Sequence, residues 1–212
     1  MKTLIITGGT IHFDFFNNFL KDNSFDYTMV VDGALDIIKD SQVKVDLIIG
    51  DLDTVDENLV LQFRDKGVEV IQFSPDKDYS DTHLALIKAL ELNASDITIV
   101  GGIGTRMDHT LANIHTLMIP TEKNIPCRIV NENNIIQCTN NTLALENTFG
   151  EYISLIPLTT EVSGISSKGL KYSLDNDKLV IGASIGISNE IIDKNAFITI
   201  KEGILIVIQS KD

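Results

Sequence analysis

The chain has 212 residues, of which 43% are hydrophobic and 22% charged, so it can build a core and is not a disordered chain. Its formal net charge of −13 argues against nucleic acid as a partner, because phosphates demand a basic surface. The two cysteines fit neither a disulfide scaffold nor a CxxC metal site, and the apolar run in "MKTLIITGGT" is too short for a signal or membrane segment. We therefore expect a cytoplasmic protein that binds neither nucleic acid nor membrane.

Up to about residue 130, short apolar runs alternate with helical patterns. The predicted strands are 3–7, 27–32, 45–50, 68–73, 96–101 and 127–130. These are continuous apolar segments, which is typical of strands buried on both faces of a parallel sheet. Between them, apolar residues three apart predict helices, as in "SDTHLALIKALEL" and "DHTLANIHTLMI". The alternation predicts an α/β domain over 1–132 with a doubly wound, mostly parallel, Rossmann-like sheet, which binds its ligand at the carboxyl ends of the strands.

After residue 132 the pattern changes, and we find no convincing helix. Short β-rich pieces recur instead: "IIQCT", "TLAL", "YISLIPL", "KLVIG", "AFITI" and "ILIVIQ". The last two resemble a hairpin that turns at Lys201-Glu202-Gly203. This change of period predicts a second domain over 133–212, an all-β sandwich.

Six aspartates follow the predicted parallel strands or open the helices after them. They are Asp32, Asp51, Asp53, Asp78, Asp81 and Asp108. In a parallel sheet all of these loops lie at one edge, so the carboxylates are expected to converge there and repel one another. A hard divalent cation removes that objection, because Mg2+ takes oxygen ligands and typically bridges carboxylates to substrate phosphates. Taken singly, Asp78, Ser80 or Asp108 is as well explained as an ordinary helix cap.

The loop "GGIGTR" after the fifth strand suits a nucleotide triphosphate. Its glycines 101, 102 and 104 offer unobstructed backbone N–H groups, and the following helix offers its positive end. Arg106 can fork onto a phosphate and Lys77 can add a point charge, although Arg106 is also open to pairing with a nearby acid and His109 to a structural role. Neither GxxxxGK[ST] nor GxGxxG is present, which argues against a Walker-type ATPase and an ordinary NAD enzyme.

Six blocks in order resemble the thiamine pyrophosphokinase family. They are "DGA" (32–34), "GDLDT" (50–54), "KDYSD" (77–81), "GGIGTRMDHTLANI" (101–114), "GLKYSL" (169–174) and "GISNE" (186–190). In that family they commonly read DGG, GDFDS, KDxTD, GxxGxRxDHxLxN, GLxWxL and GxSN. The resemblance implies an α/β catalytic domain joined to a β-sandwich, and a homodimer with its active sites at the subunit interface. It also implies Mg2+-dependent, in-line transfer of the diphosphate of ATP to the hydroxyl of thiamine, with release of AMP.

The same resemblance implies the site residues. Catalytic roles fall on Asp51, Asp53, Asp78, Arg106 and Asp108, with Asp51, Asp53 and Asp78 as the metal ligands. The ATP site comprises Asp32, Gly33, Lys77, Ser80, Asp81, Gly102, Gly104, Arg106 and His109. The thiamine site comprises Asp108, Asn113, Tyr172, Ser188 and Asn189. Tyr172 stands where the family usually has Trp; it still stacks, but with less area, so thiamine affinity is the property that this departure affects.

Two other interpretations remain open. "IIGDLDTV" also resembles the DxDxT of haloacid-dehalogenase-like phosphatases, in which Asp51 would be a nucleophile and Asp53 a general acid, but here two predicted strands precede the motif. A non-catalytic thiamine- or nucleotide-binding protein is the second; the intact charged residues Asp51, Asp78 and Arg106 argue against it.

Overall fold

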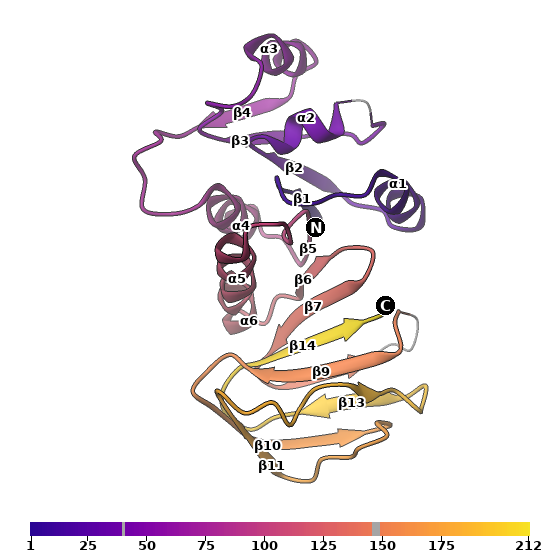
Figure 1. The fold of residues 1–212 in the computed structure, drawn as a ribbon. Coiled ribbons are helices and arrows are strands. Elements are labelled where there is room, and N and C mark those ends of the chain that lie inside the picture. The colour runs from indigo at the N-terminus through magenta and orange to yellow at the C-terminus, as the bar shows by residue number, and fades with distance from the viewer. Residues whose placement is uncertain (40, 146–148) are drawn as a thin grey trace. The chain divides into compact units, whose positions relative to one another are not determined.

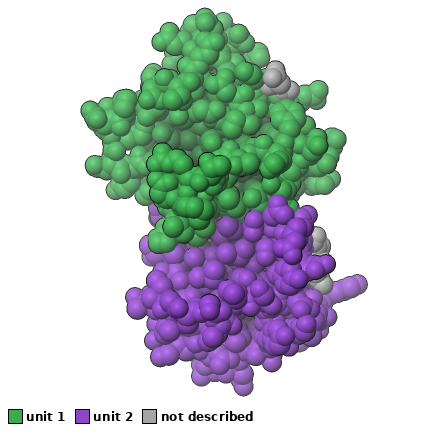
Figure 2. Space-filling model, viewed as in Figure 1, with its two compact units in different colours: residues 1–116, 125–132 green, residues 117–124, 133–212 purple. Residues whose placement is uncertain are grey.

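The computed structural model describes residues 1–39, 41–145 and 149–212. These divide into two compact units, coloured separately in Figure 2. Unit 1 consists of Met1–Thr116 and Ile125–Glu132, and unit 2 of Leu117–Asn124 and Asn133–Asp212. Among the described residues, no helix is both long and apolar enough to cross a bilayer.

Unit 1 is an α/β domain in which strands and helices alternate (Figure 1). Its strands are β1 (Lys2–Ile6), β2 (Tyr27–Val31), β3 (Leu47–Gly50), β4 (Glu69–Gln72), β5 (Asp96–Val100) and β6 (Cys127–Val130). Its helices are α1 (Phe13–Asp22), α2 (Ala34–Ile38), α3 (Glu57–Asp65), α4 (Asp81–Glu91) and α5 (Met107–Thr116). The strands lie in the order β6-β5-β1-β2-β3-β4, and every neighbouring pair is parallel. The predicted parallel sheet is thereby confirmed, with strand ends that differ by one or two residues.

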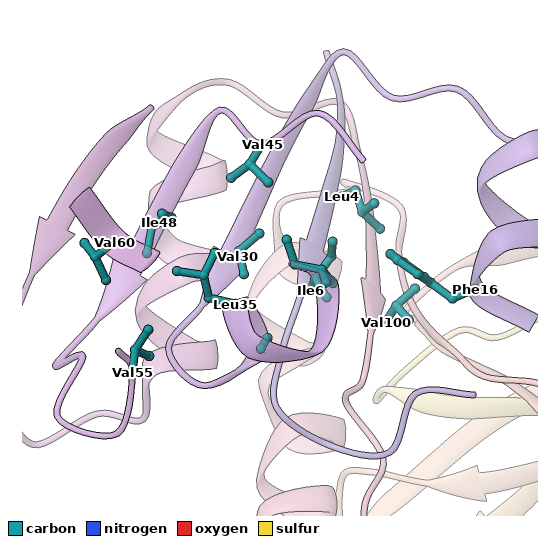
Figure 3. Packing of buried hydrophobic residues seen from close by; sticks show 12 residues of the cluster. Leu4, Ile6, Phe16, Val30, Leu35, Val45, Ile48, Val55, Val60 and Val100 are labelled. Atoms are coloured by element: carbon teal, nitrogen blue, oxygen red, sulfur yellow. The ribbon is translucent and has the colours of Figure 1, made fainter. Parts of the chain in front are cut away.

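Helices cover both faces of this sheet, which is why its central strands β1, β2, β3 and β5 are mostly apolar and buried. One face packs with α1, α2 and α3 into a single core; Figure 3 shows Leu4, Val30 and Ile48 of the strands beside Phe16 and Leu35 of the helices. Successive side chains of a strand point to opposite faces of the sheet. The buried strand residues next to Leu4, Val30 and Ile48 therefore point to the second face. Helix α4, which buries Ala85, Leu86 and Ala89, contacts β1, β2 and β3 and covers that second face.

Unit 2 holds a short helix, α6 (Met118–Glu122), and two antiparallel sheets. One sheet has the order β12-β9-β14-β7, formed by Asn189–Glu190, Tyr152–Pro157, Leu205–Ser210 and Asn134–Thr139. The other has the order β11-β10-β13-β8, formed by Asp177–Val180, Glu161–Lys168, Ala196–Thr199 and Thr142–Leu145. One hydrophobic cluster draws residues from both sheets, for example Leu155 and Val207 from the first and Ile165 and Ile198 from the second. The predicted all-β sandwich is confirmed.

The predicted hairpin at Lys201-Glu202-Gly203 is wrong. Strand β13 pairs with β10 and β8, whereas β14 pairs with β7 and β9, so the two segments belong to different sheets. The turn itself is bridged to β10 through Ser163 and Glu202, and Gly203 adopts a left-handed φ of 91°. Strands β13 and β14 bury apolar side chains, among them Ile198 and Val207, in one core from opposite sheets of the sandwich.

Candidate active site

A cavity of about 620 Å3 opens at the carboxyl-terminal edge of the parallel sheet. The cavity lies beside β1, which has β2 on one side and β5 on the other. The chain thus runs from β1 outward in one direction to β4 and then crosses back to the other side of β1, and open α/β sheets bind ligands at such switch points. The lining residues of the cavity are Thr7, Gly8, Gly9, Thr10, Val31, Asp32, Gly33, Thr54, Ser80, Asp81, Thr82, Gly101, Gly102, Gly104, Thr105, Arg106, His109, Thr110 and Asn113. The volume and the polar lining suit a small phosphorylated ligand.

The loops after β1 and β5 are locked together at the wall of this cavity. The Gly9 N–H donates to the carbonyl of Gly101 (2.9 Å), and the Thr10 N–H donates to that of Ile103 (2.8 Å). A Cβ at Gly101, whose φ is 77°, would lie 2.0 Å from the Thr7 carbonyl oxygen, so only glycine fits there. The Gly104 N–H donates to Thr110 Oγ1 (3.2 Å), so a phosphate oxygen would compete with this hydroxyl for it.

Three carboxylates gather at the ends of β2 and β3. One oxygen each of Asp32, Asp51 and Asp53 lies within 4.8 Å of the others. The approach depends on Gly50, because a Cβ there would lie 2.9 Å from Asp32 Cβ. Asp32 and Leu52 both adopt left-handed φ angles, 42° and 59°. Such strained residues persist only when the surrounding structure over-determines them, and they cluster at functional sites.

The electrostatics of this cluster favour a bound cation. The neighbouring carboxylate of Asp51 raises the pKa of Asp53 above its ordinary value, and some loss of hydration and the charge of Asp32 add to the shift. Asp32 Oδ1 is buried and accepts no hydrogen bond from any described residue, while Oδ2 accepts one from Thr54 Oγ1 (3.4 Å). Repelling carboxylate oxygens with unused acceptor capacity are the donor set that a hard divalent ion prefers, so these residues fit Mg2+. Asp78, predicted as a ligand, is exposed and does not belong to this group.

Lys77 introduces one positive charge among these acids. Its Nζ donates to Asp51 Oδ2 (3.2 Å) and lies 2.7 Å from Asp81 Oδ1, a contact whose angle is poor for a hydrogen bond. Burial opposes the charge of Lys77, but the contacts to Asp81 and Asp51 outweigh it and raise the pKa of Lys77. Burial likewise works to raise the pKa of Asp51, yet Lys77 holds that pKa below its ordinary value. Lys77 therefore keeps Asp51 ionised.

The start of α5 carries an exposed ion pair. Arg106 Nη2 lies 2.6 Å from Asp108 Oδ2, and Nε donates to Oδ1 (3.3 Å). The hydrogen bonds from Arg106 lower the pKa of Asp108 to about 2. This is the pairing with a nearby acid that the sequence left open for Arg106. Arg106 and His109 line the cavity, whereas Asp108 does not.

The remaining predicted residues of unit 1 have structural contacts of their own. Ser80 caps α4 by accepting from the His83 N–H (3.3 Å), as its N-cap alternative predicted. Asp81, in the first turn of α4, lines the cavity with Gly33 and Gly102. Asn113 is buried and donates to the Gly102 carbonyl (2.9 Å), which braces the cavity wall from α5.

Sequence reasoning missed the loop after β1. Thr7, Gly8, Gly9 and Thr10 all line the cavity. A signal was present in "TGGT", since two glycines follow directly on a predicted parallel strand, but this stretch does not complete GxGxxG. Thr54, Thr82, Thr105 and Thr110 also line the cavity; all but Thr82 lie inside the quoted blocks, but the sequence assigned a role to none of the four.

The predicted thiamine residues of unit 2 lie on two adjacent segments. Tyr172 is 62% exposed, and Lys171 Nζ lies 5.7 Å from the centroid of its ring. Ser188 has a left-handed φ of 56°, and its N–H donates to Ser154 Oγ (3.1 Å). Asn189, in contrast, is buried. An exposed aromatic face is suited to a cationic ligand, whereas a buried amide is not.

Comparison with known proteins connects both units with one family. Residues 19–129 match the model "Thiamin pyrophosphokinase, catalytic domain", and residues 135–205 match "Thiamin pyrophosphokinase, vitamin B1 binding domain". Thiamine pyrophosphokinase of Bacillus subtilis is 33% identical over 165 residues, 77% of either chain, and thiamin pyrophosphokinase 1 of Caenorhabditis elegans is 26% identical over 88% of this chain and 80% of its own. A crystal structure of the Bacillus subtilis enzyme superposes with a TM-score of 0.88 at 28% identity, covering 100% of both chains. The chain therefore belongs to the thiamin pyrophosphokinase family.

Proposed function

We propose that this protein transfers the diphosphate of ATP to the hydroxyl of thiamine, giving thiamine diphosphate and AMP. One observation carries the proposal: the catalytic-domain match, residues 19–129, covers the acidic cluster and all of the cavity lining except the loop after β1, and the vitamin B1-binding match, residues 135–205, covers most of the β-sandwich, including Tyr172. We assign residues 1–132 to ATP and Mg2+ and residues 133–212 to thiamine. Family membership also argues against the phosphatase interpretation of Asp51 and Asp53.

The reaction needs little covalent chemistry from the protein, and positioning supplies most of the effect. The thiamine oxygen attacks the β-phosphorus in line, a new O–P bond forms, and the bond to the α,β-bridging oxygen breaks. AMP leaves with that oxygen, and the hydroxyl proton passes to solvent water. Arg106, at the rim of the cavity, is suited to a phosphate oxygen once it releases Asp108, and that carboxylate is then free to orient the hydroxyl. Lys77 holds Asp51 and Asp81 in place during the transfer.

We propose that Asp32, Asp51 and Asp53 hold Mg2+ here. A bound Mg2+ supplies positive charge that offsets the charge developing on the phosphate oxygens. Asp78, which the sequence motif suggested as a third ligand, is a candidate to be tested against Asp32. Asp32→Asn and Asp78→Asn change the same chemical group, so their effects on the Mg2+ concentration for half-maximal activity compare directly. The larger increase identifies the ligand, and we expect it for Asp32→Asn.

We further propose that the protein is a homodimer with active sites at the subunit interface. The support in this chain is the segment that carries Ser188, in which Ile181, Ile185 and Ile187 are 63%, 78% and 53% exposed. Exposed apolar residues of this density mark interaction sites. Light scattering measures the mass. Asp53→Asn and Tyr172→Ala are mixed at Mg2+ and thiamine concentrations too low for either variant to be active alone, and activity above the sum of the two shows that two chains contribute to one site.

The decisive experiment is incubation with ATP, Mg2+ and thiamine, followed by chromatography of the products. We expect AMP and thiamine diphosphate in equal amounts. ADP as the main product would refute diphosphate transfer, and phosphate release without thiamine would support the phosphatase alternative. Binding of both substrates without turnover would support a non-catalytic binding protein.

A further inference from the structure

Two segments of unit 2 that are far apart in sequence run side by side. Leu170 and Ile191 form an antiparallel bridge. Next to it, the Lys171 N–H donates to the Glu190 carbonyl (3.0 Å) and the Ile192 N–H donates to the Gly169 carbonyl (2.8 Å). The segment with the tyrosine of "GLKYSL" is therefore held to the segment with the asparagine of "GISNE" by a short ladder.

Asn189 extends this ladder with its side chain. Its Oδ1 accepts from the Tyr172 N–H (3.0 Å), and its Nδ2 donates to the Tyr172 carbonyl (2.7 Å). The same Oδ1 accepts from the Glu190 N–H (2.9 Å). Both acceptor positions and one of the two donors of the amide are thus in use. The residue is only 7% exposed, so little of it is accessible to a ligand.

The contact fixes Tyr172 at both of its backbone polar groups while its ring stays open. Lys171, whose ammonium lies over that ring, is itself held by Glu190 (2.6 Å). Asn189 is anchored in turn by the pairing of β12 with β9, where it lies opposite Ile153. A side chain that binds the N–H and the carbonyl of one residue fixes that residue's backbone, and with it the direction of the Cα–Cβ bond from which the ring extends.

We propose that Asn189 is a positioning residue that holds Tyr172 for thiamine, and that it does not contact thiamine itself. The inference rests on the proposed function, because Tyr172 is taken as the aromatic face for the cationic thiazolium ring. It reassigns Asn189, which the sequence motif had placed among the thiamine contacts.

A double-mutant cycle separates the two roles. Asn189→Ala and Tyr172→Ala are each expected to raise KM for thiamine about 3- to 30-fold, the range of a lost cation–π contact, without changing KM for ATP. If Asn189 acts through Tyr172, Asn189→Ala in the Tyr172→Ala background raises KM less than twofold further. If the two effects multiply, Asn189 contacts thiamine and the proposal is overturned. Asn195→Ala, an exposed asparagine of the same unit, is the matched control and should change neither constant.

Three further tests keep the inference testable if Asn189→Ala folds poorly or if thiamine is not the substrate. Asn189→Asp retains the size but loses the donor to the Tyr172 carbonyl, and it should give the same pattern. The chain has no tryptophan, so Tyr172→Trp provides a single fluorescent reporter at the ring in question. The fluorescence anisotropy of this tryptophan should fall when Asn189 is also replaced. In the chain that keeps Tyr172, replacing Asn189 should accelerate hydrogen exchange of the Tyr172 amide. Absence of thiamine turnover refutes the proposed function alone; unchanged anisotropy and exchange refute the positioning role.

Discussion

Gly101→Ala tests whether the two locked loops shape the cavity. The substitution places a Cβ 2.0 Å from the Thr7 carbonyl oxygen, a backbone atom that cannot swing aside, and it imposes a φ of 77° on an L-residue. The left-handed backbone costs about 1–2 kcal/mol. Overpacking adds about 1–3 kcal/mol, so we expect a total loss of about 2–5 kcal/mol in the free energy of unfolding.

Gly67→Ala is the matched control in the same unit. Gly67 has a φ of 84°, but nothing lies within 4 Å of an added Cβ, so only the backbone cost of about 1–2 kcal/mol applies. With a urea m-value of about 2 kcal/mol per M, the unfolding midpoint should fall by about 1–2.5 M for Gly101→Ala and by about 0.5–1 M for Gly67→Ala. Far-UV circular dichroism follows both transitions.

The kinetic effects should also differ. Gly101→Ala displaces loops that line the cavity, so KM for ATP should rise several-fold, while Gly67→Ala should leave it unchanged. Equal destabilisation by the two substitutions would refute the steric argument. Normal KM for ATP in a destabilised Gly101→Ala would show that the locked loops do not shape the nucleotide site.

Three further substitutions test the charges at the site. Asp53→Asn should raise the Mg2+ concentration for half-maximal activity by about tenfold or more, because one ligand charge is lost; an unchanged Mg2+ titration would remove Asp53 from the metal site. Lys77→Met leaves Asp51 and Asp81 without their counter-charge, at side-chain exposures of only 17% and 20%, and should cost about 1–2 kcal/mol of stability at pH 7 without Mg2+. Because the pKa of Asp51 is lowered in the folded state, this carboxylate stabilises the fold above its ordinary pKa of 3.8, and the stabilisation is lost as pH falls through the lowered pKa. The loss of unfolding free energy in Lys77→Met, measured in urea, should therefore shrink below pH 3.8. A loss that does not depend on pH would contradict the ion-pair account. Arg106→Lys should lower kcat/KM for ATP about 10- to 100-fold through loss of a forked contact, and near-normal kcat/KM would exclude a phosphate role.

The parallel sheet was predictable because burial on both faces leaves a plain mark on the sequence. Strands β1, β2, β3 and β5 are runs of buried, mostly apolar residues, whereas the edge strand β4 is partly exposed. The β-sandwich was harder, because its strands are selected by long-range partners. Strand β10, "EVSGISSK", buries only Val162 and Ile165 among serines and was not predicted. The hairpin error has the same origin, since β13 and β14 are adjacent in sequence but packed in opposite sheets.

The candidate site, like the fold, was only partly predictable from the sequence. That Asp32, Asp51 and Asp53 would gather followed from parallel topology, which places the ends of β2 and β3 side by side. The geometry around them did not follow, because it depends on left-handed φ angles and on the space left by Gly50. The role of Asn189 was equally hidden, since a motif shows which residue is present but not whether its amide is already engaged.

The cavity lies at the carboxyl-terminal ends of the parallel strands, and their amino-terminal ends take no part in it. The segments that lead into β4 and β5, residues 66–68 and 92–95, enter the strands at their amino-terminal ends and contribute no cavity-lining residue. Loops of this kind tolerate added length, since closing a longer loop costs little free energy. A reporter peptide or surface tether inserted after Gly67 or Asn93 should therefore leave nucleotide turnover intact, which makes this end of the sheet the practical place to attach labels.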